Sequence, residues 1–326
     1  MAGYARTEAK QHARTHLRGI WCAALTPFVP GTLAFDEDGF RANLRHWFAD
    51  LGIDGVFVAG KQGEFFAMSI AERKRACEIA VEVARACGTR TIMSVSDQNL
   101  DTVLELARHA EAAGADYIVV HAPVLHFVHD RDEILWEYYR RVSEAVNIGI
   151  ALWSHPDSGY LMSPQLCARL ATLPNVVAIK YSVERAMYAE LTRLAGDTLI
   201  VSTASEEEWL DNILDLDWQV YLCSSPPYLL QTAADRRMRD YTDLAFAGRA
   251  EEARRVSASL QPVRQALKST RPGGKPQSHQ KYWQSLLGQV GGAVRPPMLE
   301  LTEAEKAATR EAFLRCGLAP LSAAAE

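Results

Sequence analysis

The alternation of short apolar runs with longer segments of helical period constrains the fold most, and it extends from Ile20 to about Gly248. Strands of a parallel sheet are buried on both faces, so they appear in a sequence as continuous apolar runs. Eight such runs are present, at 20–25, 55–58, 91–95, 117–120, 148–152, 176–179, 199–201 and 220–222. Eight strands that are each followed by a helix can close into a barrel, whereas open doubly wound sheets usually have fewer strands. We therefore predict an α/β fold, a (β/α)8 TIM barrel.

Helix start signals support this pattern. Asp36, Ser69 and Asn99 precede helical segments, where their side chains can accept from free N–H groups of the first turn. Two of these three segments stop at a glycine, which is typical of a helix end. Further helices are predicted at 131–146, 163–172, 184–195, 206–214 and 229–247.

Three more helices are predicted after the last strand, at 248–268, 280–290 and 302–316. We expect this helical extension to pack on the barrel or on another subunit. The predicted organisation is an N-terminal arm (1–18), a barrel (19–248) and a C-terminal helical extension (249–326).

The composition of the 326-residue chain excludes several classes of protein. A hydrophobic content of 48% is sufficient for a large core and argues against disorder. The 35 basic and 40 acidic residues include no basic block, so we expect no nucleic-acid partner. The six cysteines are scattered singly, without the spacing of a zinc site or the density of a disulfide scaffold, and are expected to be reduced.

No segment approaches the roughly 18 apolar residues of a membrane span, and the first residues lack the apolar run of a secretory signal. We therefore expect a cytoplasmic protein with a small-molecule substrate and no membrane partner. His121, His126 and His129 lie close together in the sequence, but they lack the i, i+4 spacing of a zinc-binding helix. No metal site is predicted.

The most informative candidate is Lys180, which ends the sixth apolar run. Active sites of such barrels gather at the C-terminal ends of the strands. Burial favours the neutral amine, which can attack a carbonyl, so a Schiff-base lysine is the functional interpretation. The alternative is a strand-end lysine that extends to solvent.

Other strand ends carry further candidates. The second run is followed by a glycine-flanked loop, and the fifth run ends in an aromatic, a hydroxyl and an imidazole that could hold a proton or bind substrate. The eighth run is followed by hydroxyl residues that could bind a polar end of the substrate. Each segment also has a simpler interpretation: the loop after the second run is a turn with an exposed lysine, the histidine after the fifth run is a hydrogen-bonded structural residue, and the hydroxyls after the eighth run cap a turn. The predicted catalytic residues besides Lys180 are Lys61, Trp153 and His155, and the predicted substrate-binding residues are Gly60, Gln62, Gly63, Glu64, Ser154, Thr203, Leu222, Cys223 and Ser224.

In order and position, several motifs together resemble those of the dihydrodipicolinate synthase and N-acetylneuraminate lyase family of class I aldolases. The resemblance covers about Leu17 to Ala319. Its landmarks are Gly19-Ile20, Leu25-Thr26-Pro27-Phe28, Gly60-x-x-Gly63-Glu64, Ser69-x-x-Glu72-Arg73, Ala113-Gly114-Ala115-Asp116, Ala178-Ile179-Lys180 and Arg295-Pro296-Pro297.

The resemblance implies a barrel with a helical C-terminal extension, in which a strand-six lysine forms a Schiff base with pyruvate or a related 2-oxo acid. That role falls on Lys180, and no separate cofactor is implied. Members of the family are commonly homotetramers, and we expect a homo-oligomer here, a dimer or a tetramer. The segment Gln280-Lys281-Tyr282 and the loop before it are similar to the hydratase-aldolase branch, which acts on benzylidenepyruvates.

The sequence departs from the family pattern at the positions of the usual proton relay. Two hydroxyl residues of the glycine loop are replaced by Lys61 and Gln62, and the strand-five tyrosine by Trp153, which has no group that titrates near pH 7. The aromatic pair expected after Pro123 is replaced by Val124-Leu125.

Three interpretations of Lys61 are open. It could lie near Lys180, where two ammonium groups favour the neutral form of each other, or it could pair with a substrate carboxylate. It could also form an ion pair with Glu64 or a neighbouring acid.

The leading hypothesis is a lysine-dependent lyase or aldolase acting on a 2-oxo acid, with an atypical proton relay and Trp153 stacked on an apolar or aromatic part of the substrate. A dehydratase or hydratase of the same family is an alternative within enzymes. The alternative from another class is a catalytically altered barrel that binds a small carboxylate or a protein partner.

Overall fold

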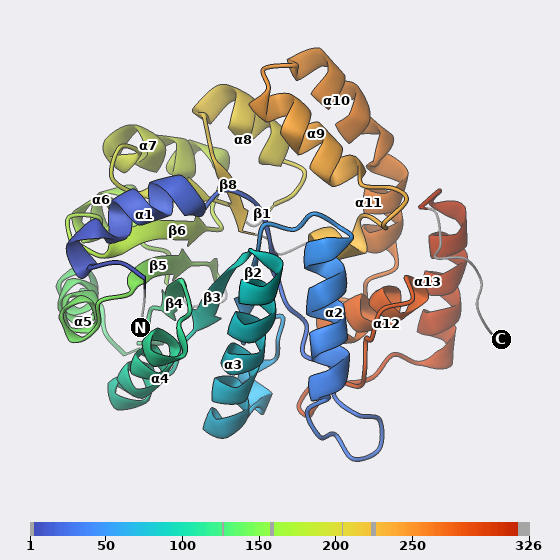
Figure 1. The fold of residues 1–326 in the computed structure, drawn as a ribbon, viewed down its shortest axis with the longest axis horizontal. Coiled ribbons are helices and arrows are strands. Elements are labelled where there is room, and N and C mark those ends of the chain that lie inside the picture. Colours follow the sequence, from blue (N-terminus) through green and yellow to red (C-terminus); the bar gives the residue numbers. More distant parts are fainter. Residues whose placement is uncertain (1–2, 126, 157–159, 204, 223–225, 319–326) are drawn as a thin grey trace.

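A nearly closed barrel of eight parallel strands forms the centre of the molecule (Figure 1). The computed structural model describes residues 3–125, 127–156, 160–203, 205–222 and 226–318. The strands are β1 (Gly19–Ala23), β2 (Gly55–Val58), β3 (Arg90–Ser94), β4 (Tyr117–His121), β5 (Gly149–Ser154), β6 (Val176–Tyr181), β7 (Ile200–Ser202) and β8 (Val220–Leu222). They pair in the order β7-β6-β5-β4-β3-β2-β1-β8. The predicted (β/α)8 barrel with a C-terminal helical part is confirmed.

The ladder ends at β7 and β8, and a side chain joins these two strands. The backbone N–H of Leu222 donates to Ser202 Oγ at 2.8 Å, and Ser202 is fully buried. Because the described residues of β7 and β8 share no ladder, this hydroxyl supplies an acceptor that a neighbouring strand would otherwise provide.

Helices surround the barrel in the predicted alternation. They are α2 (Glu37–Ala49), α3 (Ile70–Cys87), α4 (Leu100–Ala113), α5 (Asp132–Ala145), α6 (Pro164–Leu170), α7 (Arg185–Ala195), α8 (Trp209–Leu216) and α9 (Arg237–Phe246). The predicted caps at Asp36, Ser69 and Asn99 each accept a backbone N–H of the first turn. The helix predicted at 229–247 is shorter, because a 3-10 turn (Pro227–Leu229) follows β8 and α9 begins only at Arg237. Within the described part of the chain, no helix is long and apolar enough to cross a membrane.

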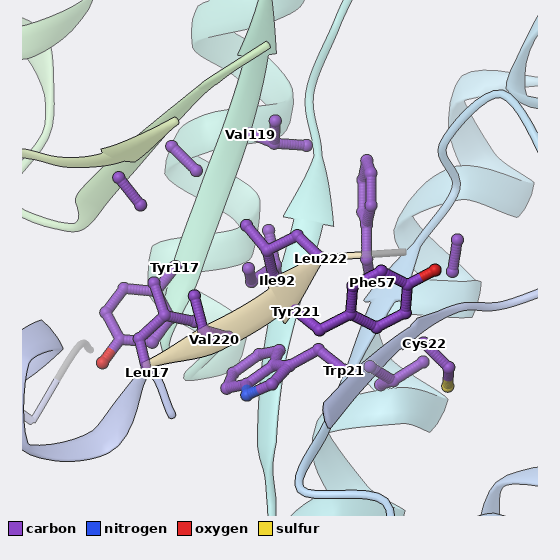
Figure 2. Packing of buried hydrophobic residues seen from close by; sticks show 14 of the residues in the cluster. Leu17, Trp21, Cys22, Phe57, Ile92, Tyr117, Val119, Val220, Tyr221 and Leu222 are labelled. Atoms are coloured by element: carbon purple, nitrogen blue, oxygen red, sulfur yellow. The ribbon is translucent and has the colours of Figure 1, made fainter. Parts of the chain in front are cut away.

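The core contains large aromatic side chains next to small residues. Trp21 of β1 is fully buried, and a Cβ atom on Gly55 of β2 would lie 2.5 Å from its ring. Figure 2 shows Trp21 and Phe57 in the buried cluster together with Ile92 of β3 and Leu222 of β8. Glycine at position 55 is therefore required for the close packing of β1 against β2.

The N-terminal arm is ordered by a 3-10 turn (Arg6–Glu8) and by α1 (Ala9–His16), which the sequence pattern did not predict. Tyr117, the first residue of β4, forms a hydrogen bond of 2.9 Å with His12 Nδ1. The backbone N–H of Gly149, the first residue of β5, donates to the Tyr4 hydroxyl at 2.9 Å. The arm thus packs at the amino-terminal ends of the strands, opposite the end where Lys180 lies.

The C-terminal extension packs on the barrel beside α2 and α8 (Figure 1). It comprises α10 (Ala250–Ser259), α11 (Gln261–Ser269), α12 (Pro276–Leu286) and α13 (Glu303–Arg315). The single helix predicted at 248–268 is wrong: it is two helices that meet at Leu260, because Pro262 has no N–H to continue the helical ladder. The helix predicted at 280–290 begins earlier, at Pro276. Trp283 Nε1 donates to the Leu229 carbonyl at 3.0 Å and fixes α12 to the barrel.

Candidate active site

Lys180 lies near the carboxyl end of β6 and is only 3% exposed. In the sheet register it pairs with Trp153 of β5 and with Ser202 of β7. Its Nζ lies 5.7 Å from the centre of the Phe57 ring of β2, across the barrel. The Lys180 side chain therefore lies inside the barrel and does not extend to solvent.

A pocket of about 370 Å³ opens at the same end of the barrel. It is lined by residues that follow β2 and β3 and by residues at the ends of β4 and β5, namely Lys61, Phe65, Phe66, Ser96, Asp97, Gln98, His121, Ala122, Val124 and Trp153. Lys61 and Trp153 were predicted site residues, and the pocket brings them together. Trp153 also pairs in register with Lys180, so the wall of the pocket is continuous with the strand that carries the buried amine.

Aromatic rings determine the geometry of this wall. The imidazole of His121 stacks on Trp153 with ring centres 4.0 Å apart, and His155 stacks on Trp153 at 5.1 Å. The Phe65 ring meets the His121 ring edge-on at 5.9 Å. The backbone N–H of His121 donates to Ser96 Oγ at 3.0 Å, so both the backbone and the ring of His121 are held in place.

Positive charge predominates around His121. Burial is the main cause that lowers the pKa of His121 to about 3, and the charges of Lys180, Arg73 and Lys61 lower it further. Arg73 is itself 2% exposed and donates to the carbonyls of Ser94 and Ser96 at 3.2 and 2.9 Å. His121 is therefore neutral at pH 7, and the charged groups around it are Lys180, Lys61, Arg73 and the carboxylate of Asp97, which lies 3.7 Å from Arg73.

The glycine loop after β2 is shaped by close contacts. A Cβ atom on Gly60 would lie 2.8 Å from the Phe57 ring, and one on Gly63 would lie 3.0 Å from the Ala24 carbonyl of the segment after β1. Glu64 adopts φ = 57°, in the left-handed region. The predicted Gly60 and Gly63 thus permit the backbone to pass close to β1 and β2, and they present Lys61 to the pocket.

The predicted substrate-binding residue Glu64 holds the C-terminal extension. Its carboxylate is fully buried, pairs with Lys281 Nζ at 2.5 Å and accepts the backbone N–H of Arg295 at 2.9 Å. Gln277 of α12 donates to the Lys61 carbonyl at 3.3 Å. Gln62 in the same loop is 8% exposed. The structure therefore places the carboxylate of Glu64 against the extension.

Three other predicted residues make contacts within the barrel. Ser154 Oγ accepts the backbone N–H of Met162 at 3.1 Å, and Thr203 Oγ1 lies 3.5 Å from the Glu208 carboxylate. Leu222 is buried beside Ser202. The contacts of Ser154 and Thr203 hold segments that follow β5 and β7, and that of Leu222 joins β7 to β8. The predicted residues Cys223 and Ser224 lie outside the described residues.

Sequence reasoning missed several residues of the pocket, above all His121, Phe65 and Phe66. His121 directly follows the apolar run 117–120, so the rule that selected Lys180 would also have selected it. It was weighed only as a metal ligand, and groups of three or more metal-ligating side chains are absent from the part of the chain that the structure describes. The aromatic residues after Glu64 carried no comparable signal.

Comparisons with known proteins agree with this geometry. Residues 16–314 match the Dihydrodipicolinate synthetase family. A 4-hydroxy-tetrahydrodipicolinate synthase of Methanothrix thermoacetophila is 26% identical over 91% of this chain and 96% of its own, and that of Rhodospirillum centenum is 29% identical over 92% and 99%.

Among solved structures, YagE, a prophage protein of the dihydrodipicolinic acid synthase family from E. coli K12 in complex with pyruvate, has a TM-score of 0.81 and 22% identity over 93% of this chain and 99% of its own. The dihydrodipicolinate synthase of Aquifex aeolicus has a TM-score of 0.80 and 22% identity over 94% and 100%. The structures share the fold, and the family match over nearly the whole chain confirms the predicted resemblance and the predicted class of enzyme, a lyase. This chain belongs to the dihydrodipicolinate synthetase family.

Proposed function

We propose that this protein is a class I lyase in which Lys180 forms a Schiff base with a 2-oxo acid such as pyruvate. The observation that carries the proposal is the burial of the Lys180 amine, 3% exposed, at the carboxyl end of β6. A solved member of the family, YagE, is described in complex with pyruvate, which supports the same substrate class here.

The chemistry follows from the amine. The neutral Lys180 nitrogen adds to the ketone carbon, and the resulting carbinolamine takes up a proton and loses water to give an iminium ion. The positive nitrogen withdraws electrons, so loss of a C3 proton gives an enamine. The enamine carbon then attacks the carbonyl carbon of an aldehyde, whose oxygen takes up a proton; cleavage is the reverse.

The second substrate has an apolar or aromatic portion in this proposal. Phe65, Phe66 and Trp153 line the pocket with Val124, and Phe66 is 44% exposed although it is a large hydrophobic residue. Such a surface gains free energy when an apolar group covers it. This agrees with the similarity of the C-terminal segment to the hydratase-aldolase branch.

Lys61 has two roles that fit its place in the pocket wall. It can pair with the substrate carboxylate, or its charge can favour the neutral form of Lys180. The carboxylate of Glu64 is engaged by Lys281 and by the Arg295 N–H, which favours these two roles over a pair between Lys61 and Glu64. His155, partly exposed and stacked on Trp153, is the second candidate for moving protons.

Borohydride trapping tests the proposal. The protein is incubated with pyruvate and sodium borohydride, and a stable adduct is expected on Lys180 by peptide mass spectrometry, absent from Lys180→Ala. A panel of 2-oxo acids and of aliphatic and aromatic aldehydes then defines the substrates, and product analysis separates aldol chemistry from hydration. No adduct with any oxo acid would refute the Schiff base. A barrel that only binds carboxylates would instead show pyruvate-dependent thermal stabilisation that persists in Lys180→Ala.

A further inference from the structure

We propose that the imidazole of His121 is the base that removes the C3 proton from the iminium on Lys180 and returns it to the acceptor oxygen. This inference rests on the proposed function, because it assigns a step that follows Schiff-base formation. It makes His121 a catalytic residue and assigns the stacked Trp153 a positioning role.

The geometry supplies the first argument. His121, Trp153 and Lys180 are partners in register on β4, β5 and β6, so the three residues form one row across adjacent strands. His121 is one of the residues that line the pocket, and its Nε2 is buried with no hydrogen-bond partner among the described residues. A buried nitrogen without a partner is costly unless a ligand uses it.

Rigidity supplies the second argument. The His121 ring lies against the face of Trp153 at 4.0 Å and against the Phe65 ring at 5.9 Å. Its backbone is bonded to Ser96. A proton acceptor that is already oriented loses little conformational freedom when the substrate binds, which is a requirement for efficient general base catalysis.

Charge supplies the third argument. Burial, the largest cause, and the positive charges near the ring lower the pKa of His121 to about 3, so at pH 7 the imidazole holds no proton and has a lone pair to accept one. When the C3 proton moves to His121, the C–H electron pair forms the C2–C3 double bond and the iminium becomes a neutral enamine. The positive charge passes from the Lys180 nitrogen to the imidazole, and the number of charges in the site is unchanged. The repulsion from Lys180 that lowers the pKa of His121 is therefore absent once the proton has moved.

Deuterium exchange into the methyl group of pyruvate measures this step alone. Exchange in D2O is followed by proton NMR for the wild type, His121→Gln and His121→Phe. We expect both variants to lose exchange by on the order of 10²–10⁴-fold, the usual contribution of a positioned acid or base. Both should still give the borohydride-trapped adduct on Lys180. His46→Gln is the matched control, since His46 lies on α2 and pairs with Asp50 away from the pocket; it should exchange at the wild-type rate.

The two variants separate catalysis from packing. His121→Phe retains an aromatic ring for the stack on Trp153, so a purely structural histidine would be replaced by Phe without loss of exchange. Exchange near the wild-type rate in either variant would overturn the assignment to His121 and leave the Schiff base intact. Loss of trapping in a folded variant would overturn it as well, because the assigned step follows imine formation. Absence of a trapped adduct in the wild type would instead refute the proposed function.

Discussion

The buried ion pair between Glu64 and Lys281 joins the glycine loop to the C-terminal extension, and its removal should be costly. The two side chains are 0% and 2% exposed, and their charged atoms are 2.5 Å apart. Lys281 also donates to the Ala293 carbonyl at 2.6 Å and lies 4.5 Å from the centre of the Phe28 ring. Lys281→Met keeps an unbranched side chain but leaves the carboxylate buried with the Arg295 N–H as its remaining described donor.

The size of the effect follows from this burial. Removal of one partner of a buried pair costs about 3–5 kcal/mol, because the remaining charge is desolvated without compensation. At roughly 2 °C per kcal/mol for a domain of this size, the melting temperature should fall by about 6–10 °C. Neutralising both partners removes most of this penalty, so Glu64→Gln combined with Lys281→Met should melt closer to the wild type than Lys281→Met does.

Calorimetry or circular dichroism of the purified protein at pH 7 measures these melting temperatures. Lys306→Met is the matched control, since Lys306 pairs with Glu303 on the surface, where the side chains are 36% and 90% exposed. The control should melt with the wild type, because exposed pairs contribute little. If Lys281→Met melts within 2 °C of the control, or if the double variant is less stable than Lys281→Met, the buried pair does not hold the loop as argued.

Two further predictions concern the contact that joins β7 to β8 and the ion pair between Glu72 and Arg295. Ser202→Ala removes the acceptor of the buried Leu222 N–H and should destabilise the fold by about 1–3 kcal/mol in urea unfolding; an unchanged midpoint would show that β7 and β8 close without it. The hydrogen bonds from Arg295 lower the pKa of Glu72 to about 2, so its stabilising contribution is present above its ordinary pKa of 4.5 and is lost as the pH falls from about 5 to 2. Glu72→Gln should therefore flatten the pH dependence of the melting temperature between about pH 5 and 2. An unchanged slope would show that the ion pair of Glu72 with Arg295 does not contribute to stability.

The alternation of strands and helices could be predicted because each element obeys a local rule. The strand predicted at 55–58 and the helix caps predicted at Ser69 and Asn99 are found at those positions in the structure. Buried parallel strands require apolar side chains on both faces, and helix ends require capping groups. Each of these requirements concerns the residues of a single segment, so it can be recognised in the sequence without knowledge of the rest of the fold.

The elements that were missed depend on contacts between distant segments. Helix α1 has eight residues, of which only Ala9 and Ala13 are buried. Its sequence therefore lacks the apolar stripe from which a helix can be predicted. It is held by contacts such as that of His12 with Tyr117, more than 100 positions away. The partnership of Glu64 with Lys281 likewise joins residues far apart in the sequence. The sequence predicted Glu64 as a polar residue at the mouth of the barrel. It could not show that the carboxylate points to Lys281 of the C-terminal extension.

The C-terminal extension is best understood as part of the active-site scaffold. Gln277 donates to the carbonyl of Lys61, and Lys281 pairs with the carboxylate of Glu64. The backbone N–H of Arg295 donates to the Glu64 carboxylate, and its guanidinium pairs with Glu72 of α3. Each contact reaches the loop that presents Lys61 or the helix that follows it. Because a loop with two residues in the left-handed region, Ala59 and Glu64, is strained by itself, these contacts fix the conformation in which Lys61 faces the pocket. The position of the site's second lysine therefore depends on residues more than 200 positions later in the chain.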